Sequence, residues 1–196
     1  MTLSPEFEKT DEDLWVFGYG SLIWRPGFEF VESAPARITG LHRSLCVYSW
    51  FHRGTQQRPG LVLGLDRGGA CRGVAFRVAA AQRAATIAYL REREQVTHVY
   101  RENLRRAMLL DRSERQIDAL CYVVDRGHPQ YAGRLSLEQQ LDHIRQAHGQ
   151  SGPNGDYVLS TVAALESLGF RDADLHFLAE RLNGRRHTAD TVPDLI

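Results

Sequence analysis

The chain has 196 residues, of which 43% are hydrophobic, and this length suits one domain with one buried core. Its 24 basic residues are balanced by 24 acidic residues, so the formal net charge is zero. Without an excess of positive charge, the composition argues against a protein that binds nucleic acid or an anionic membrane surface. No apolar run approaches the length that crosses a bilayer, so we expect no membrane association.

The cysteines and the N-terminal composition indicate the compartment. Cys46, Cys71 and Cys121 are far apart, odd in number and set in apolar segments, which favours reduced core thiols over a disulfide framework. Residues 1–13 are acidic and aperiodic and lack the apolar region of a secretory signal, so we expect a loose lead-in there. These features predict a cytoplasmic protein.

Short apolar runs separated by turn residues predict a strand-rich first part. A buried strand is expected at 15–17, where two aromatic residues flank a valine. Gly68 and Gly69 can adopt positive φ, so the residues around them predict a hairpin turn between two short strands. The other predicted strands are 36–50 (one long strand, or a pair bent at Gly40), 61–65, 71–78, 98–110 (where the pattern also permits a helix) and 116–124.

The last third carries helical signals. Ser136 and Gln139 form a capping box that opens a helix, and Gly149 is expected to stop it. Further amphipathic helices are predicted over 157–168 and 172–184. Because strands come first and helices follow, the order predicts an α+β domain with a closed or strongly curved sheet. We expect a single domain over 14–184, followed by a tail over 185–196.

The turn after the first strand is the first candidate site. Gly18, Tyr19, Gly20 and Ser21 follow the apolar strand directly. Glycine permits unusual backbone angles and lets a ligand approach the main chain, so this turn is expected to present amide N–H groups that bind an oxygen or a carboxylate. A tight turn that binds nothing fits the same short pattern.

A helix predicted over 79–94 supplies the second candidate. At about 100° per residue, Glu94 falls on the face of Ile87 and Leu90, whereas Glu92 falls on the opposite side. A carboxyl on the buried face loses solvation, which raises its pKa toward that of a general base. Glu94 is therefore the predicted base. The alternative is that the helix frays earlier and both glutamates pair with neighbouring arginines.

Other polar residues are also candidates for chemistry. The eight histidines lack the spacing that places two imidazoles on one helical turn, so no metal site is predicted. Ser21 follows a strand at a sharp turn but lacks the second glycine of a hydrolase elbow, which indicates a hydrogen-bonding residue and not a nucleophile. His52, Arg53 and Tyr157 lie in glycine-rich surroundings, where each could meet a charged ligand or remain solvated.

Several short motifs occur together in a fixed order. They lie at residues 16–24, 52–55, 59–63, 73–77, 89–94 and 151–157. In sequence and order they resemble the ChaC family of glutathione-specific γ-glutamylcyclotransferases. The resemblance extends from about residue 15 to 178.

The resemblance implies a fold, a reaction and a set of site residues. The fold would be a small mixed β-barrel with flanking helices, without metal or cofactor. The reaction would be attack of the α-amine of a γ-glutamyl group on its own γ-carbonyl, which converts glutathione to 5-oxoproline and cysteinylglycine. Glu94 matches the family's catalytic residue. The matches to substrate-binding positions are Gly18, Tyr19, Gly20, Ser21, Leu22 and Ile23, with Arg53 and Tyr157 as further candidates.

Two alternatives to a glutathione-degrading enzyme remain open. One is a non-catalytic protein that senses a γ-glutamyl compound, although retention of Glu94 favours an enzyme. The other is cyclisation of a different γ-glutamyl amine, because residues 95–99 lack the glycine pair that some family members carry after the glutamate. We expect a monomer whose partner is a small molecule.

Overall fold

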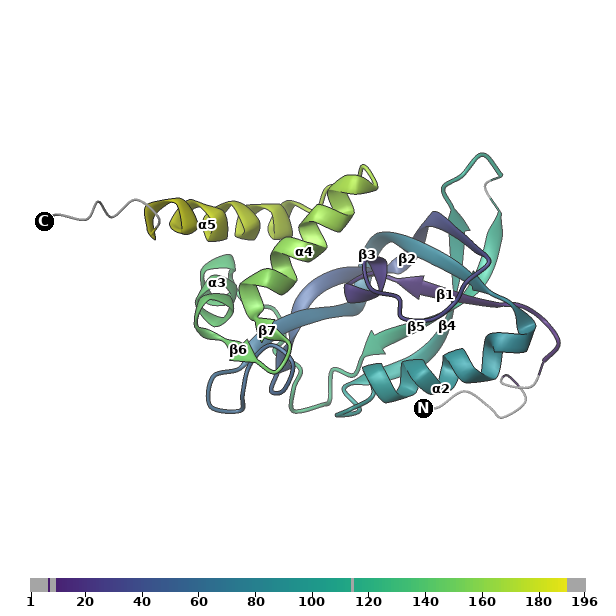
Figure 1. Ribbon diagram of the computed structural model, residues 1–196, viewed down its shortest axis with the longest axis horizontal. Coiled ribbons are helices and arrows are strands. Elements are labelled where there is room, and N and C mark those ends of the chain that lie inside the picture. Colours follow the sequence, from purple (N-terminus) through teal and green to yellow (C-terminus); the bar gives the residue numbers. More distant parts are fainter. Residues whose placement is uncertain (1–6, 8–9, 114, 190–196) are drawn as a thin grey trace, which may run out of the picture. The chain divides into compact units, whose positions relative to one another are not determined.

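The computed structural model describes residue 7, residues 10–113 and residues 115–189, and for 185–189 it describes the backbone alone (Figure 1). The chain divides into two compact units, Met1–Val47 with Leu63–Gly133 and Tyr48–Val62 with Arg134–Ile196. That residues 14–184 form one domain stays a prediction, and the predicted lead-in and tail lie largely outside the described residues.

The first unit is a closed β-barrel. Its strands are β1 (Leu14–Gly18), β2 (Glu32–Ser49), β3 (Gly60–Val78), β4 (Tyr100–Leu109) and β5 (Gln116–Val124). The last two residues of β2 and the first three of β3 belong to the second unit. They close in the order β1-β3-β2-β4-β5, with β3 also pairing with β5. Strand β1 is antiparallel to β3 and parallel to β5, so it is paired on both edges. The predicted closed sheet is confirmed.

Strand β3 differs from the prediction. It is one continuous strand, so the hairpin expected around Gly68 and Gly69 is wrong. Both glycines do adopt positive φ, at 102° and 65°. On one side of them Leu65 pairs with Val123 of β5, and on the other side the strand pairs with β1. Because the two halves have different partners, the glycines bend the strand around the barrel without reversing it.

Helix α2 (Arg83–Glu94) packs against the barrel after the short 3₁₀ turn η2 (Ala80–Gln82), as Figure 1 shows. Its buried Ile87 and Leu90 join Val16, Leu120 and Tyr122 in one hydrophobic cluster. The predicted helix is confirmed, and it ends at Glu94 without earlier fraying. Strands β4 and β5 confirm the strands expected in the following segments.

The second unit contains the remaining helices. They are α3 (Leu137–Gln146), α4 (Asn154–Ser167) and α5 (Ala173–Ala189), with the two-residue strands β6 (His148–Gly149) and β7 (Gly152–Pro153) between α3 and α4. The capping box at Ser136 and Gln139 is confirmed. Helix α4 begins three residues before Tyr157, and α5 continues past Gly184. Among the described helices, none has the length and apolar composition required to cross a membrane.

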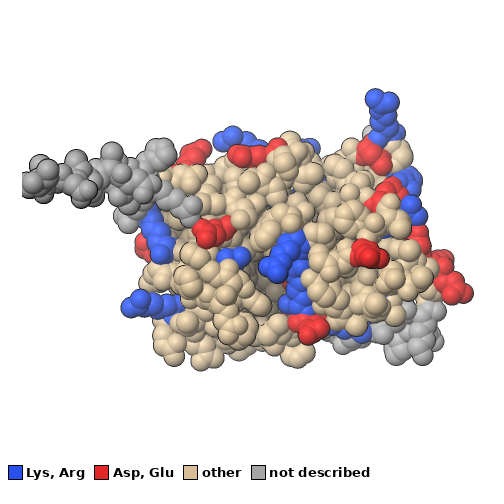
Figure 2. Space-filling view, in the orientation of Figure 1, with Lys and Arg blue, Asp and Glu red and all other residues tan. Residues whose placement is uncertain are grey.

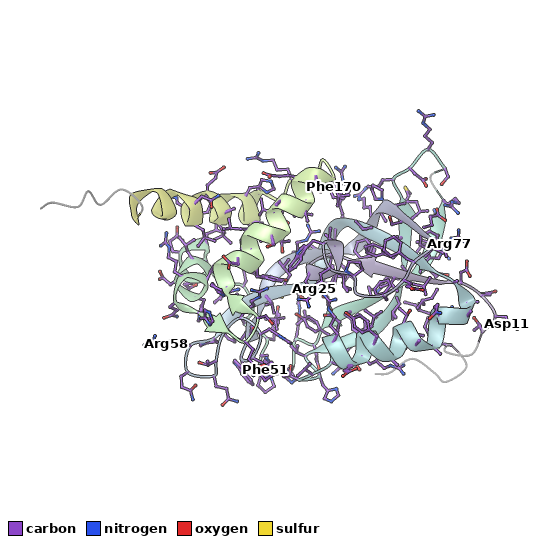
Figure 3. All side chains as sticks on the ribbon, viewed as in Figure 1. Asp11, Arg25, Phe51, Arg58, Arg77 and Phe170 are labelled. Carbon is purple, nitrogen blue, oxygen red and sulfur yellow. The ribbon has the colours of Figure 1, made fainter. Side chains whose placement is uncertain are left out.

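Several arginines of the first unit form ion pairs with acidic side chains near the surface. Arg77 of β3 (Figure 3) contacts Asp13 at 2.7 Å and Glu32 at 2.8 Å, and Arg115 contacts Glu32 at 2.6 Å. Acidic and basic side chains both reach the face drawn in Figure 2. These exposed pairs are screened by water and contribute little to stability.

Asn154 is the buried polar residue that joins α4 to the start of β3 within the second unit. Its side chain is fully buried. Its Oδ1 accepts a hydrogen bond from the Leu61 N–H at 2.7 Å, and its Nδ2 donates to the Leu61 carbonyl at 2.8 Å. The side chain therefore completes the pairing of a strand residue as a neighbouring strand would.

We expect Asn154→Ala to lower the free energy of unfolding by about 2–4 kcal/mol, because the Leu61 N–H and carbonyl would lose their partners in a buried position. Denaturant unfolding of the purified variant measures this change. Asn183→Ala, which alters an exposed asparagine, is the control and should leave the midpoint nearly unchanged. A wild-type midpoint for Asn154→Ala would contradict the role of this side chain.

Candidate functional site

Close packing around the end of β1 leaves no room for side chains at two glycines. Gly18 ends β1, and the 3₁₀ turn η1 (Ser21–Ile23) follows. A Cβ on Gly18 would lie 3.1 Å from Leu22 Cβ and 3.1 Å from the Phe76 ring, and a Cβ on Gly73 would overlap the Gly18 carbonyl oxygen. Neither Gly18 nor Gly20 adopts positive φ. At Gly18, crowding and not an unusual backbone angle accounts for the glycine.

The turn leaves backbone donors without partners. The Ile23 N–H donates to the Gly20 carbonyl at 2.9 Å, and the Arg25 N–H donates to the Ser21 carbonyl at 2.8 Å. In the part of the chain that the structure describes, the N–H groups of Gly20, Ser21 and Leu22 have no hydrogen-bond acceptor. Consecutive N–H groups of this kind form a concave site for an oxygen anion.

Two side chains of the turn hold it in place. The Tyr19 hydroxyl donates to the Tyr122 carbonyl at 2.9 Å, and the Tyr19 carbonyl accepts from Arg43 Nε at 2.6 Å. Leu22 lies in the hydrophobic cluster with Leu90. Tyr19 and Leu22 are therefore buried anchors of the turn.

Glu94 is the last residue of α2, and its side chain is 17% exposed. Glu92 is exposed, so the predicted facing of the two glutamates is confirmed. Arg93 Nε lies 3.3 Å from Glu94 Oε1. Burial raises the pKa of Glu94, and the positive charge of Arg93 offsets part of that rise. A carboxylate with a raised pKa is a stronger base than an exposed one.

Ser21 and Glu94 are brought to one region by Arg93, which donates from Nη2 to Ser21 Oγ at 3.0 Å. Because Ser21 Oγ accepts this bond, its own hydrogen is free to be donated, and no acceptor for it occurs among the described residues. Ser21 thus offers a hydroxyl donor beside the unpartnered N–H groups. This arrangement agrees with its expected hydrogen-bonding role.

A second carboxylate lies behind the helix and was not identified from the sequence. Glu102 of β4 is buried and accepts from Arg91 at 2.7 and 3.0 Å. The Tyr122 hydroxyl donates to the same carboxylate at 3.3 Å. Burial raises the pKa of Tyr122, and the charges of Glu102 and Glu94 act in the same direction. The sequence around Glu102 does not indicate that its side chain is buried and paired. Its partner, Arg91, lies eleven residues earlier on α2.

Arg53 and Tyr157 belong to the second unit and contact each other there. The Arg53 guanidinium lies 5.7 Å from the centre of the Tyr157 ring, and Arg53 Nη1 donates to the Pro153 carbonyl at 3.2 Å. Tyr157 is buried, whereas Arg53 is half-buried. The two predicted residues therefore form one small cluster in the second unit, whereas Glu94 belongs to the first unit.

Two other features of the described residues bear on ligands. No group of three His, Cys, Asp or Glu side chains that could hold a metal ion occurs among them.

The second unit has an open groove of about 510 Å³ between α3 and α5, lined by residues that include Leu141, Arg145 and Phe177. The groove contains none of the predicted site residues.

Comparison with known proteins identifies the family. A family model described as ChaC-like protein matches residues 14–184. The glutathione-specific gamma-glutamylcyclotransferase of Escherichia coli (strain K12) is 33% identical over 181 residues, which cover 92% of this chain and 77% of that protein. Human glutathione-specific gamma-glutamylcyclotransferase 1 is 33% identical over 183 residues, covering 91% and 82%.

The fold has a counterpart among solved structures. The crystal structure of a γ-glutamyl cyclotransferase specific to glutathione from yeast matches with a TM-score of 0.81 at 22% identity, covering 90% of this chain and 98% of that one. Together with the match over 14–184, these likenesses establish that the chain belongs to the ChaC-like protein family.

Proposed function

We propose that this protein is a glutathione-specific γ-glutamylcyclotransferase of the cytoplasm, which acts as a monomer. The observation that carries the proposal is the inward-facing Glu94, tied through Arg93 to a turn with unpartnered N–H groups. The relatives named above are all described as acting on glutathione. The three cysteines are buried and none of them forms a disulfide, as suits a compartment in which thiols stay reduced.

Glu94 acts as the base in this proposal. The α-amine of glutathione is largely protonated near neutral pH, so a base must remove a proton before the nitrogen can attack. The free amine then attacks the γ-carbonyl carbon, a new C–N bond forms, and the bond to the cysteine nitrogen breaks. Glu94 returns this proton to the leaving nitrogen as that bond breaks. Its carboxylate then takes the second proton from the new ring nitrogen and passes it to the released amine. The products are 5-oxoproline and cysteinylglycine, and no water is consumed.

The turn Gly18–Ile23 binds the γ-glutamyl group in this proposal. The N–H groups of Gly20, Ser21 and Leu22 would stabilise the negative charge that develops on the γ-oxygen, an effect worth about 3 kcal/mol for one donor. The Ser21 hydroxyl adds a further donor. Ring closure also gains from holding the amine and the carbonyl in attack geometry.

We expect Glu94→Gln to fold and bind glutathione but to lower kcat by about 10²–10⁴-fold, because the amide cannot accept the proton. Mass spectrometry of 5-oxoproline and cysteinylglycine, with purified protein and glutathione alone, measures this. Glu92→Gln is the matched control, since it alters an exposed glutamate of the same helix.

The same assay separates the alternatives. Near-normal turnover by Glu94→Gln would remove Glu94 from the role of base. If wild type binds glutathione but forms neither product, the sensor hypothesis replaces the enzyme. Turnover of another γ-glutamyl amine in place of glutathione would keep the reaction and change the substrate.

The pH dependence follows from the raised pKa of Glu94. The carboxylate must be ionised to accept a proton, so kcat/KM is expected to rise with pH as Glu94 ionises. Because burial raises this pKa, the acidic limb should lie above the ordinary glutamate value of about 4.3. A pH–rate profile with glutathione checks this, and a limb at or below that value would contradict the assignment.

Arg53 and Tyr157 are proposed to bind a substrate carboxylate through the Arg53 charge. We expect Arg53→Met to raise KM for glutathione about 10- to 100-fold with little change in kcat, because one charged hydrogen bond is worth about 1.5–3 kcal/mol. Arg58→Met alters an exposed arginine of the same loop (Figure 3) and serves as the control. An unchanged KM for Arg53→Met would exclude the residue from binding.

A further inference from the structure

Arg93 contacts the segment after β1 at several points. From one terminal nitrogen it donates to Ser21 Oγ at 3.0 Å. From the other it donates to the carbonyls of Arg25 (Figure 3) at 2.6 Å and Pro26 at 3.1 Å. These acceptors are 67 to 72 residues away in the chain. One side chain thus fastens the end of α2 to the turn.

The same guanidinium also contacts its own helix. Its Nε lies 3.3 Å from Glu94 Oε1, and Nη1 donates to the Tyr89 hydroxyl at 3.0 Å. Gly27 makes room for Tyr89, because a Cβ there would overlap the Tyr89 hydroxyl. The guanidinium is planar and rigid, so contacts on both of its sides are held at fixed spacing.

We propose that Arg93 is a positioning residue that fixes the spacing and orientation of Glu94 relative to the turn Gly18–Ile23. The inference rests on the proposed function for its consequence in catalysis. Its geometric part does not, because the contacts of Arg93 exist whatever the ligand is. A shift of about 1 Å between a base and its substrate can cost about 10²-fold in rate, so this fastening matters for turnover.

Arg93 also acts on Glu94 through its charge. Its positive charge lowers the pKa of Glu94, against the rise that burial causes. Tyr122 of β5 is a further ionisable group near this carboxylate, and the charge of Glu94 acts on it. Tyr122 also faces Glu102 of β4, which is paired with Arg91. Removal of Arg93 therefore leaves burial, unopposed by that charge, to favour the protonated form of Glu94.

The test compares Arg93→Gln, Arg93→Lys and the control Arg106→Gln, which removes a largely exposed arginine of β4. Three quantities are measured: kcat and KM for glutathione, the Glu94 titration midpoint by carbon-13 NMR, and the hydrogen-exchange rates of the Ile23 and Arg25 amides. The last two do not depend on activity. They therefore separate failure of this inference from failure of the proposed function.

For Arg93→Gln we expect kcat/KM to fall about 10²-fold, the Glu94 midpoint to move to higher pH and both amides to exchange faster. Arg93→Lys keeps the positive charge but lacks the planar guanidinium with its several donors. Its kcat/KM should therefore also fall, whereas its Glu94 titration midpoint should stay nearer to that of wild type. Arg106→Gln should match wild type in all three.

Wild-type kinetics and exchange in Arg93→Lys would overturn the inference, as would an unmoved Glu94 midpoint and unchanged exchange in Arg93→Gln. If Arg93→Gln does not fold, the kinetics and amide exchange of Arg93→Lys decide whether the inference holds. If wild type does not convert glutathione but the midpoint and exchange rates change as expected, the positioning role holds and the proposed function fails.

Discussion

The site depends on how β1 is paired. Strand β1 lies between β3 and β5, and its pairing with β3 continues to Gly18. Past that point the chain turns into η1, and Gly73 of β3 has no side chain because a Cβ would overlap the Gly18 carbonyl oxygen. The N–H groups that follow are left without ladder partners. These N–H groups therefore remain available as donors to an oxygen ligand, which could bind without breaking a hydrogen bond of the sheet.

The end of α2 shows a second conflict between stability and chemistry. A carboxylate at the C-terminus of a helix faces the negative end of the helix dipole, whereas Arg91 and Arg93 suit that position. Glu94 is also withdrawn from water. Burial and helix position both disfavour its charge, and Arg93 moderates the effect. A base needs this intermediate state, because a fully paired carboxylate would bind protons too weakly.

What could be predicted from the sequence was local. The facing of Glu94 follows from helical periodicity alone, and the capping box at Ser136 needs only four residues. The hairpin at Gly68 was predicted wrongly because turn residues do not distinguish a bend within a strand from a reversal. The contact between Arg93 and Ser21 joins residues 72 apart, so it becomes visible only when the barrel is closed.

The partner of Ser21 decides which chemistry the turn suits. A nucleophilic serine needs a base that accepts its proton, as histidine does in hydrolases. Ser21 Oγ instead accepts a hydrogen bond from a guanidinium, which cannot remove a proton. The described residues around the turn therefore include a buried carboxylate and hydrogen-bond donors, but no serine paired with a group that could take its proton. An intramolecular cyclisation needs only these two components, since the substrate's own amine is the nucleophile, and this match favours cyclotransfer over hydrolysis at this site.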